Sequence, residues 1–272
     1  MNTTEQLTDD EKIAPKIWKV NISDIERAAL LCKTDLTTKM VIEFPELQGI
    51  MGKYYAINDG EKEDVAIAIE QHYWPINAED GIPTTDMGKI LALSDKLDTL
   101  VGCFIMNFKC NASSDAFKMR RNAIAIIRII IEGEINICLK ELIEECIEIF
   151  KNNSNKEIKL NKEDITNKTL DFIKNKLINY YEEKKIKNDV VKAVLAIESN
   201  NLLDINNRIM ALNKFSSSEK GKKIISTYKR VDKLLKSYKE PIEATSINPE
   251  LFEHESEKIL YKKIKEISDE RK

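Results

Sequence analysis

Apolar residues recur every three or four positions along most of this 272-residue chain, and this spacing constrains the possible folds most strongly. In the first clear segment the spacing runs from Ile22 to Met40, which predicts a helix with one apolar stripe facing a core. No segment shows the strict alternation of a β-strand, and the chain holds only 8 Gly and 6 Pro. We therefore expect an all-α fold.

Capping residues and breakers divide the chain into further helices. We expect Asp24 or Ser23 to cap the first helix and Gly133 to break the long helix that begins at about residue 115. The polar run Asn152–Asn155 is the clearest linker, so we predict a loose lead at 1–22, a helical domain at 23–155 and a second at 156–272. The later helices are expected at about 61–73, 85–104, 115–132, 139–151, 163–184, 188–198, 202–214, 219–237 and 256–268.

A tight turn is predicted directly after the first helix. Pro45 disfavours helical backbone at Phe44, so the helix has to end there. Gly49 and Gly52 follow, and glycine is the residue that permits tight turns and close backbone approach. We call the segment Phe44–Gly52 the elbow and expect it to connect the first helix to the next one.

Charge is distributed unevenly, although the net charge is only -3. The segment from Lys214 to Lys239 contains nine basic and two acidic residues, whereas the segment from Glu132 to Glu148 contains six acidic residues and one basic. Such asymmetry suits one surface that binds a polyanion and another that does not. Solvated helix faces explain the two runs equally well.

Several features indicate a cytoplasmic protein with no membrane partner. The five cysteines are odd in number and form no C-x-x-C pair, which favours reduced thiols. The first twelve residues are polar and acidic, unlike a secretory signal. The most apolar run, Ala123–Ile131, is too short to span a bilayer and contains Arg128.

Residues that could carry catalysis are few. His72 and Asp95 could occupy positions of the HD phosphohydrolase pattern, which the first half resembles, but the His-Asp doublet is absent from Ala28–Leu36. The other histidine, His254, lies beyond the linker, so we expect no hydrolytic metal centre and expect helix-end His72 to be satisfied by water or backbone. Asp95 and Asp98 could hold a cation or a basic partner, but a solvated face with Lys96 is commoner.

Motifs for nucleotide chemistry are absent as well. The sequence contains no phosphate-binding glycine loop of a familiar kind and no motif of a synthetase active site. We therefore predict no catalytic residue, no cofactor site and no metal site in this chain.

Contact with structured RNA is better supported, because basic residues are interleaved with aromatic ones. Phe117 lies in the first basic group, and Tyr228 and Tyr238 lie in the second. Lysine and arginine neutralise phosphates, and aromatic rings stack on unpaired bases. The candidate RNA-binding residues are Lys109, Lys118, Arg120, Arg121, Arg128, Lys222, Lys223, Lys229, Arg230 and Lys233.

Several separated motifs point to one family. They include the elbow Phe44–Gly52 with Tyr54-Tyr55-Ala56 after it, and they continue in order through Val65–Pro75, Leu91–Phe104, Asp189–Ala196 and Arg208–Leu212. Over roughly Ser23 to Lys265 the chain resembles the bacterial glycyl-tRNA synthetase β subunit. It departs from that pattern at Ala116, where the family usually has proline, and in lacking the long N-terminal region.

The resemblance implies a degenerate HD-like helical domain followed by most of a helical anticodon-binding domain, in a C-terminal portion of the subunit. It implies that this chain grips tRNA-Gly within an α2β2 assembly. The α subunit would use ATP and Mg²⁺ to form glycyl-adenylate and transfer the glycine. Two alternatives stay open: a metal-dependent HD-type phosphohydrolase, and a non-catalytic helical scaffold whose partner is a protein.

Overall fold

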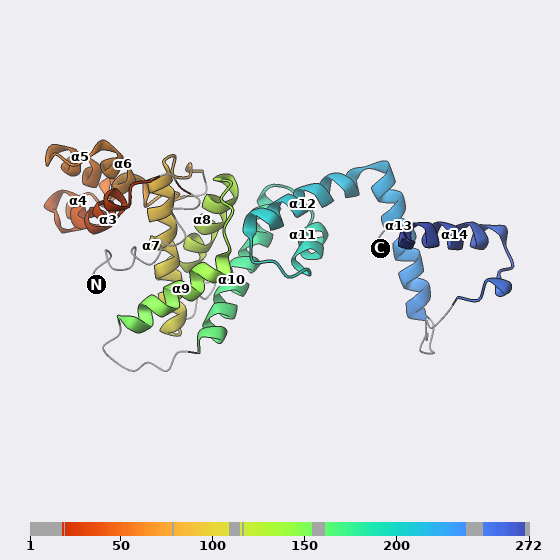
Figure 1. Cartoon of the computed structure of the whole chain (residues 1–272). Coiled ribbons are helices and arrows are strands. Elements are labelled where there is room, and N and C mark those ends of the chain that lie inside the picture. The colour runs from red at the N-terminus through yellow and green to blue at the C-terminus, as the bar shows by residue number, and fades with distance from the viewer. Residues whose placement is uncertain are drawn as a thin grey trace. The chain divides into compact units, whose positions relative to one another are not determined.

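The computed structural model describes residues 18, 20–77, 79–108, 115, 117–153, 161–237 and 247–269. Every regular element within these ranges is a helix, which confirms the all-α prediction (Figure 1). The α-helices are α3 (Ile22–Leu31), α4 (Lys39–Glu43), α5 (Ile50–Asn58), α6 (Glu63–Gln71), α7 (Asp86–Ile105), α8 (Met119–Glu132), α9 (Leu139–Asn152), α10 (Lys162–Glu183), α11 (Asn188–Leu195), α12 (Leu202–Ser217), α13 (Glu219–Ser237) and α14 (Glu255–Asp269). Short 3₁₀ helices cover Thr34–Thr37, Pro45–Leu47 and Pro249–Leu251.

The long helix α7 lies at the centre of the core, as its apolar spacing predicts. It packs against α6, α8, α9 and α10. Leu97, Leu100 and Val101 of α7 are almost completely buried, and so are Ile126 and Ile130 of α8. Each such side chain contributes about 1.5–3 kcal/mol when it leaves water, so this contact contributes substantially to the stability of the core.

The first predicted helix is wrong in its length. Helix α3 ends at Leu31, and Leu36 and Met40 are exposed rather than part of one buried stripe. Threonine hydroxyls break the helix by competing for backbone groups, since Thr34 Oγ1 donates to the Leu31 carbonyl at 2.8 Å. The predicted caps Asp24 and Ser23 are also wrong: the Asn21 side chain accepts from the Ser23 backbone N–H at 3.0 Å.

The elbow has the predicted form. Pro45 opens a 3₁₀ helix, and Gly49 adopts a φ of 82° immediately before α5. The buried Asp35 carboxylate accepts the Gly49 backbone N–H at 2.7 Å, which ties the elbow to the broken end of the first helix. A β-carbon added at Gly49 would lie 2.6 Å from Tyr73 Cδ2, so only glycine fits there.

The chain divides into two compact units, Met1–Ser217 and Ser218–Lys272. The expected domain boundary near residue 155 falls within the first unit, because α10 packs against α7, α8 and α9. Ile173 and Leu177 of α10 are fully buried in that shared core. The packing of α10 therefore places it in the same compact unit as the helices before it. The division into domains at 23–155 and 156–272, which follows the resembled family, stays a prediction.

Candidate nucleic-acid interface

The first group of predicted RNA-binding residues lies at the start of α8. Lys118 is exposed, has a φ of 54° and precedes the first helical residue. Arg120 is held by Asp115, whose Oδ2 accepts its backbone N–H at 3.2 Å and lies 3.7 Å from its Nε. Lys118 and Arg121 have exposed side chains with no ionic partner among the described residues, so both can neutralise phosphates.

Arg128, two turns along the same helix, is already engaged within the fold. Its Nη2 donates to the Asp80 carbonyl at 2.6 Å, and its Nη1 donates to the Asn77 carbonyl at 3.3 Å. Its Nε also donates to Glu132 Oε1 at 3.2 Å. This guanidinium therefore holds the loop 75–80, of which the structure describes 75–77 and 79–80, against α8 through Asn77 and Asp80.

Replacing this guanidinium tests that assignment. We expect Arg128→Met to lower the free energy of unfolding by about 2 kcal/mol, because two loop carbonyls lose a charged donor. Urea unfolding followed by tryptophan fluorescence measures the loss. Arg121→Met on the same face is the matched control and should change stability by less than about 0.5 kcal/mol. Equal effects of the two substitutions would contradict the assignment.

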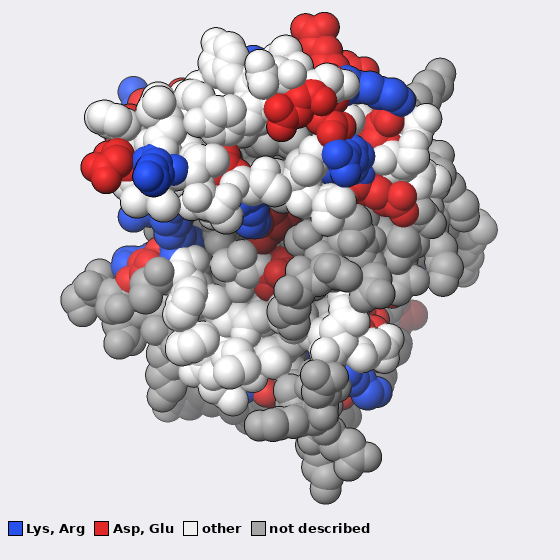
Figure 2. Space-filling view, turned by 90° about the vertical axis from the view of Figure 1, so that its left-hand side faces the viewer, with Lys and Arg blue, Asp and Glu red and all other residues white. Residues whose placement is uncertain are grey.

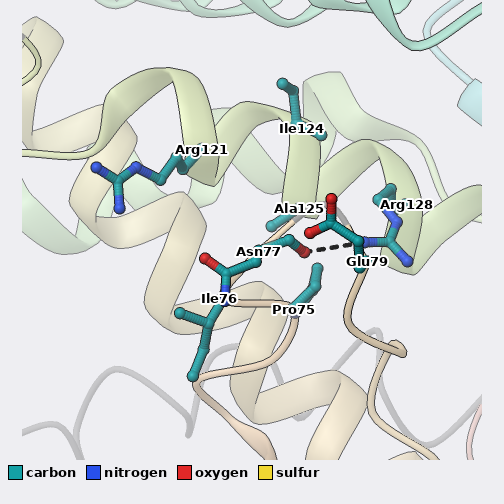
Figure 3. A pocket seen from close by; sticks show the side chains of 8 residues that line it. All are labelled: Pro75, Ile76, Asn77, Glu79, Arg121, Ile124, Ala125 and Arg128. Carbon is teal, nitrogen blue, oxygen red and sulfur yellow. Dashed lines mark hydrogen bonds between the residues drawn. The ribbon is translucent and has the colours of Figure 1, made fainter. Parts of the chain in front are cut away.

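An open pocket of about 290 Å³ lies between this loop and α8 (Figure 3). Arg121 and Arg128 lie at its two ends, with Ile124 and Ala125 between them. Pro75, Asn77 and Glu79 line it from the loop side. The pocket contributes two loop residues, Asn77 and Glu79, that sequence reasoning missed, because only the fold brings that loop beside α8.

The second predicted group lies on α13, in the other compact unit. Lys222, Lys223, Lys229, Arg230 and Lys233 are all exposed and lie on one face of the helix. Lys222 Nζ lies 3.3 Å from Glu219 Oε1, whereas the other four have no ionic partner within the described ranges. Exposed Tyr228 lies on the opposite, apolar face of α13, so the predicted interleaving of basic and aromatic side chains does not produce one mixed surface here.

Two residues named in the prediction of RNA binding lie in segments that the structure does not describe. Lys109 lies outside the described residues, and so does Tyr238. Next to that gap, Phe108 and Phe117 form an exposed aromatic pair whose ring centroids are 4.6 Å apart. Phe117 was predicted to accompany the basic group, but its pairing with Phe108 depends on tertiary structure.

The face that carries α3 to α6 has a different character. Figure 2 shows basic and acidic side chains mixed there, without a continuous basic patch. Three ion pairs lie among these elements: Arg27 with Glu61, Lys53 with Glu70, and Lys62 with Asp24. Because these three cations are paired with carboxylates of the same face, they offer less to a polyanion than unpaired cations do.

The HD-like positions form a polar cluster in which His72 and Lys96 are buried and Asp95 is half-buried, rather than the solvated face that the sequence favoured. Asp95 Oδ1 lies 2.5 Å from Lys33 Nζ, and the burial of Lys96 leaves its side chain 4% exposed. Lys96 Nζ donates to the His72 carbonyl at 2.9 Å. Burial lowers the pKa of Lys96 to about 8, although the nearby Asp95 carboxylate acts in the opposite direction.

His72 fulfils the expectation of a histidine satisfied by the backbone. It caps the C-terminal end of α6, is fully buried, and its Nδ1 lies 2.6 Å from the Ile69 carbonyl. Its Nε2 is buried without a hydrogen-bond partner. Within the described ranges no group of three or more His, Cys, Asp or Glu side chains converges in a way that could hold a metal ion.

Comparison with known proteins shows which family the chain belongs to. The family model described as glycyl-tRNA synthetase beta subunit matches residues 3–196. The chain belongs to the glycyl-tRNA synthetase beta subunit family. The match covers α3 to α11, and so includes both the elbow and the pocket beside α8.

Individual members of the family are similar along almost the whole chain. Proteins named glycine–tRNA ligase beta subunit from Buchnera aphidicola subsp. Acyrthosiphon pisum (strain Tuc7) and Colwellia psychrerythraea are each 39% identical, over 93% and 91% of this chain. The protein of that name from Hahella chejuensis is 36% identical over 95%. The chain spans only 35–36% of the length of these three relatives. No helix in the described ranges is long and apolar enough to cross a membrane.

Proposed function

We propose that this chain is a tRNA-binding portion of the beta subunit of glycine–tRNA ligase. The observation that carries the proposal is the pair of exposed cations at the start of α8, Lys118 and Arg121, which have no ionic partner among the described residues and lie within the part of the chain that matches the family model. Long-range attraction to phosphates requires such free charges, whereas cations paired within the fold contribute little. The four cations of α13 that lack an ionic partner in the described part of the chain support the same role in the second unit.

The remaining expectations follow from membership of this family. We propose that the chain works with an α subunit in an α2β2 assembly in the cytoplasm. The α subunit would carry out the ATP- and Mg²⁺-dependent activation of glycine and its transfer to tRNA-Gly. In this division of labour the Lys33–Asp95 ion pair and the buried His72 serve the stability of the fold rather than catalysis.

A titration of tRNA-Gly tests the proposal, with a non-cognate tRNA measured beside it at two salt concentrations. We expect tighter binding of tRNA-Gly and a steep loss of affinity as salt rises, because bound cations release counterions from the RNA. The double variant Lys118→Glu/Arg121→Glu should bind at least about tenfold more weakly and show a salt slope smaller by roughly 1–2.

The matched control makes the same change of charge away from the interface. Lys39 and Lys187 are exposed and have no ionic partner among the described residues, so Lys39→Glu/Lys187→Glu alters the net charge equally. We expect this control to bind tRNA-Gly within about twofold of the unsubstituted chain. The proposal would be refuted if the affinity for tRNA-Gly changed neither with salt concentration nor with the charge reversal Lys118→Glu/Arg121→Glu.

A further inference from the structure

We propose that the pocket between the loop 75–80 and α8 accepts one unpaired nucleotide of the bound RNA. The inference rests on the proposed tRNA-binding function and names the site and the chemical unit recognised. It follows from a pocket that combines a partly apolar floor, one unpaired guanidinium at its edge and one carboxylate in its wall.

Size and floor both suit a nucleobase. The pocket measures about 290 Å³, at the lower end of the roughly 300–1,000 Å³ that small-molecule sites occupy, so it holds one ring system and not a helix or a peptide. Ile124 and Ala125 form its floor between the two arginines (Figure 3). A base that has left its helical stack exposes an apolar face, and a floor of this kind covers it.

The two arginines have different tasks. Arg128 is bound to two loop carbonyls and to Glu132, so it closes one end of the pocket as a fixed wall. Arg121, at the other end, is exposed and has no partner in the described part of the chain. Its guanidinium is therefore available to bind a phosphate oxygen of the same nucleotide or to stack on the base.

Glu79, in the wall of the pocket, makes the pocket selective for unpaired bases. A carboxylate repels phosphate but accepts hydrogen bonds from amino and imino groups, at least one of which every RNA base presents on its base-pairing edge. In a duplex those edges are already paired, and the base faces are stacked. The pocket therefore discriminates in favour of unpaired nucleotides, whereas a purely basic surface would bind duplex RNA as well.

The loop wall is organised before RNA arrives. The Asp80 carboxylate accepts the backbone N–H groups of Ile76 and Asn77, at 3.0 and 2.7 Å, and Arg128 binds the Asn77 and Asp80 carbonyls. A preformed wall avoids the entropy cost of ordering a loop upon binding. This explains why a small pocket can contribute measurably to affinity.

Filling the pocket without changing its charge tests the proposal. Ile124 is half-buried at the floor, so Ile124→Trp occupies the space of the base, and Asn77→Trp does so from the exposed loop. Affinity of the full chain would be measured for a tRNA-Gly transcript, a short single-stranded RNA and a blunt duplex RNA. We expect the fillers to weaken binding of the first two by about tenfold and of the duplex by less than about twofold.

Ile42→Trp is the matched control, because Ile42 is 62% exposed on α4, far in sequence from the pocket. It should bind all three RNAs like the unsubstituted chain. If the unsubstituted chain fails to bind tRNA, both this inference and the proposed function fall. If it binds tRNA with the expected salt dependence but both fillers bind single strands normally, or lose duplex binding equally, only the pocket is refuted.

Discussion

Gly49→Ala is expected to lower the free energy of unfolding by about 3 kcal/mol or more. Two costs add at this position. The φ of 82° strains any residue with a β-carbon, at roughly 1–3 kcal/mol. The new β-carbon would also lie 2.6 Å from Tyr73 Cδ2 and 3.3 Å from the Glu70 carbonyl, in a turn that the Asp35 carboxylate holds in place.

A second glycine of the chain separates these two costs. Gly60 has a φ of 83°, but a β-carbon there would meet no atom within 4 Å, so Gly60→Ala measures backbone strain without the collision. We expect it to cost about 1 kcal/mol. Urea unfolding monitored by fluorescence reports both variants, since the two tryptophans, Trp18 and Trp74, lie in the first unit. Equal losses for the two variants would show that contact with Tyr73 contributes nothing.

The elbow illustrates what sequence alone can predict. Proline and glycine act through their own backbone restrictions, so Pro45 and Gly49 indicate a turn wherever the rest of the chain lies. The apolar spacing likewise predicts α7, which spans Asp86–Ile105 where a helix was expected at about 85–104. Asp35 could not be assigned in this way, because its partner, the Gly49 backbone N–H, is fourteen residues away and is set by the packing of α5 and α6.

Charged residues were the least predictable part of the site. Lys96 was expected on a solvated face but is buried, because the carbonyl at the end of α6 and the Asp95 carboxylate lie beside it. Arg121 and Arg128 lie two turns apart on the same face of α8, and the sequence alone does not distinguish them. In the structure the loop 75–80 binds Arg128 and leaves Arg121 exposed. A helical pattern fixes the face on which a side chain lies, but not which distant loop covers that face.

His72 should make the stability of the fold depend on pH in a specific window. Burial, the largest influence, lowers its pKa from 6.5 to about 4; the Asp95 carboxylate opposes this shift, and Lys33 acts in the same direction as burial. The Nδ1 contact with the Ile69 carbonyl implies that Nδ1 carries the proton of the neutral ring. A second proton would then have to enter at Nε2, which is buried without an acceptor.

Proton linkage determines whether the free energy of unfolding rises or falls with pH. Above pH 6.5 the ring is neutral in both states, and its titration costs no stability. As the pH falls from 6.5 towards 4, the unfolded chain binds a proton that the folded chain refuses, so stability falls by up to about 1.4 kcal/mol per pH unit. Relative to His72→Gln, which cannot titrate, the unsubstituted chain should lose about 2 kcal/mol between pH 7 and pH 5.

Urea unfolding of both chains across this range measures the difference, and common titrations of the carboxylates cancel in it. His254 provides the matched control, since it is exposed and lies in the second unit, so His254→Gln should leave the pH profile of the first unit unchanged. Parallel profiles for the unsubstituted chain and His72→Gln would mean that the folded protein accepts the second proton. The imidazole would then have access to water or to an acid partner, and its assignment as a buried structural group at the end of α6 would be wrong.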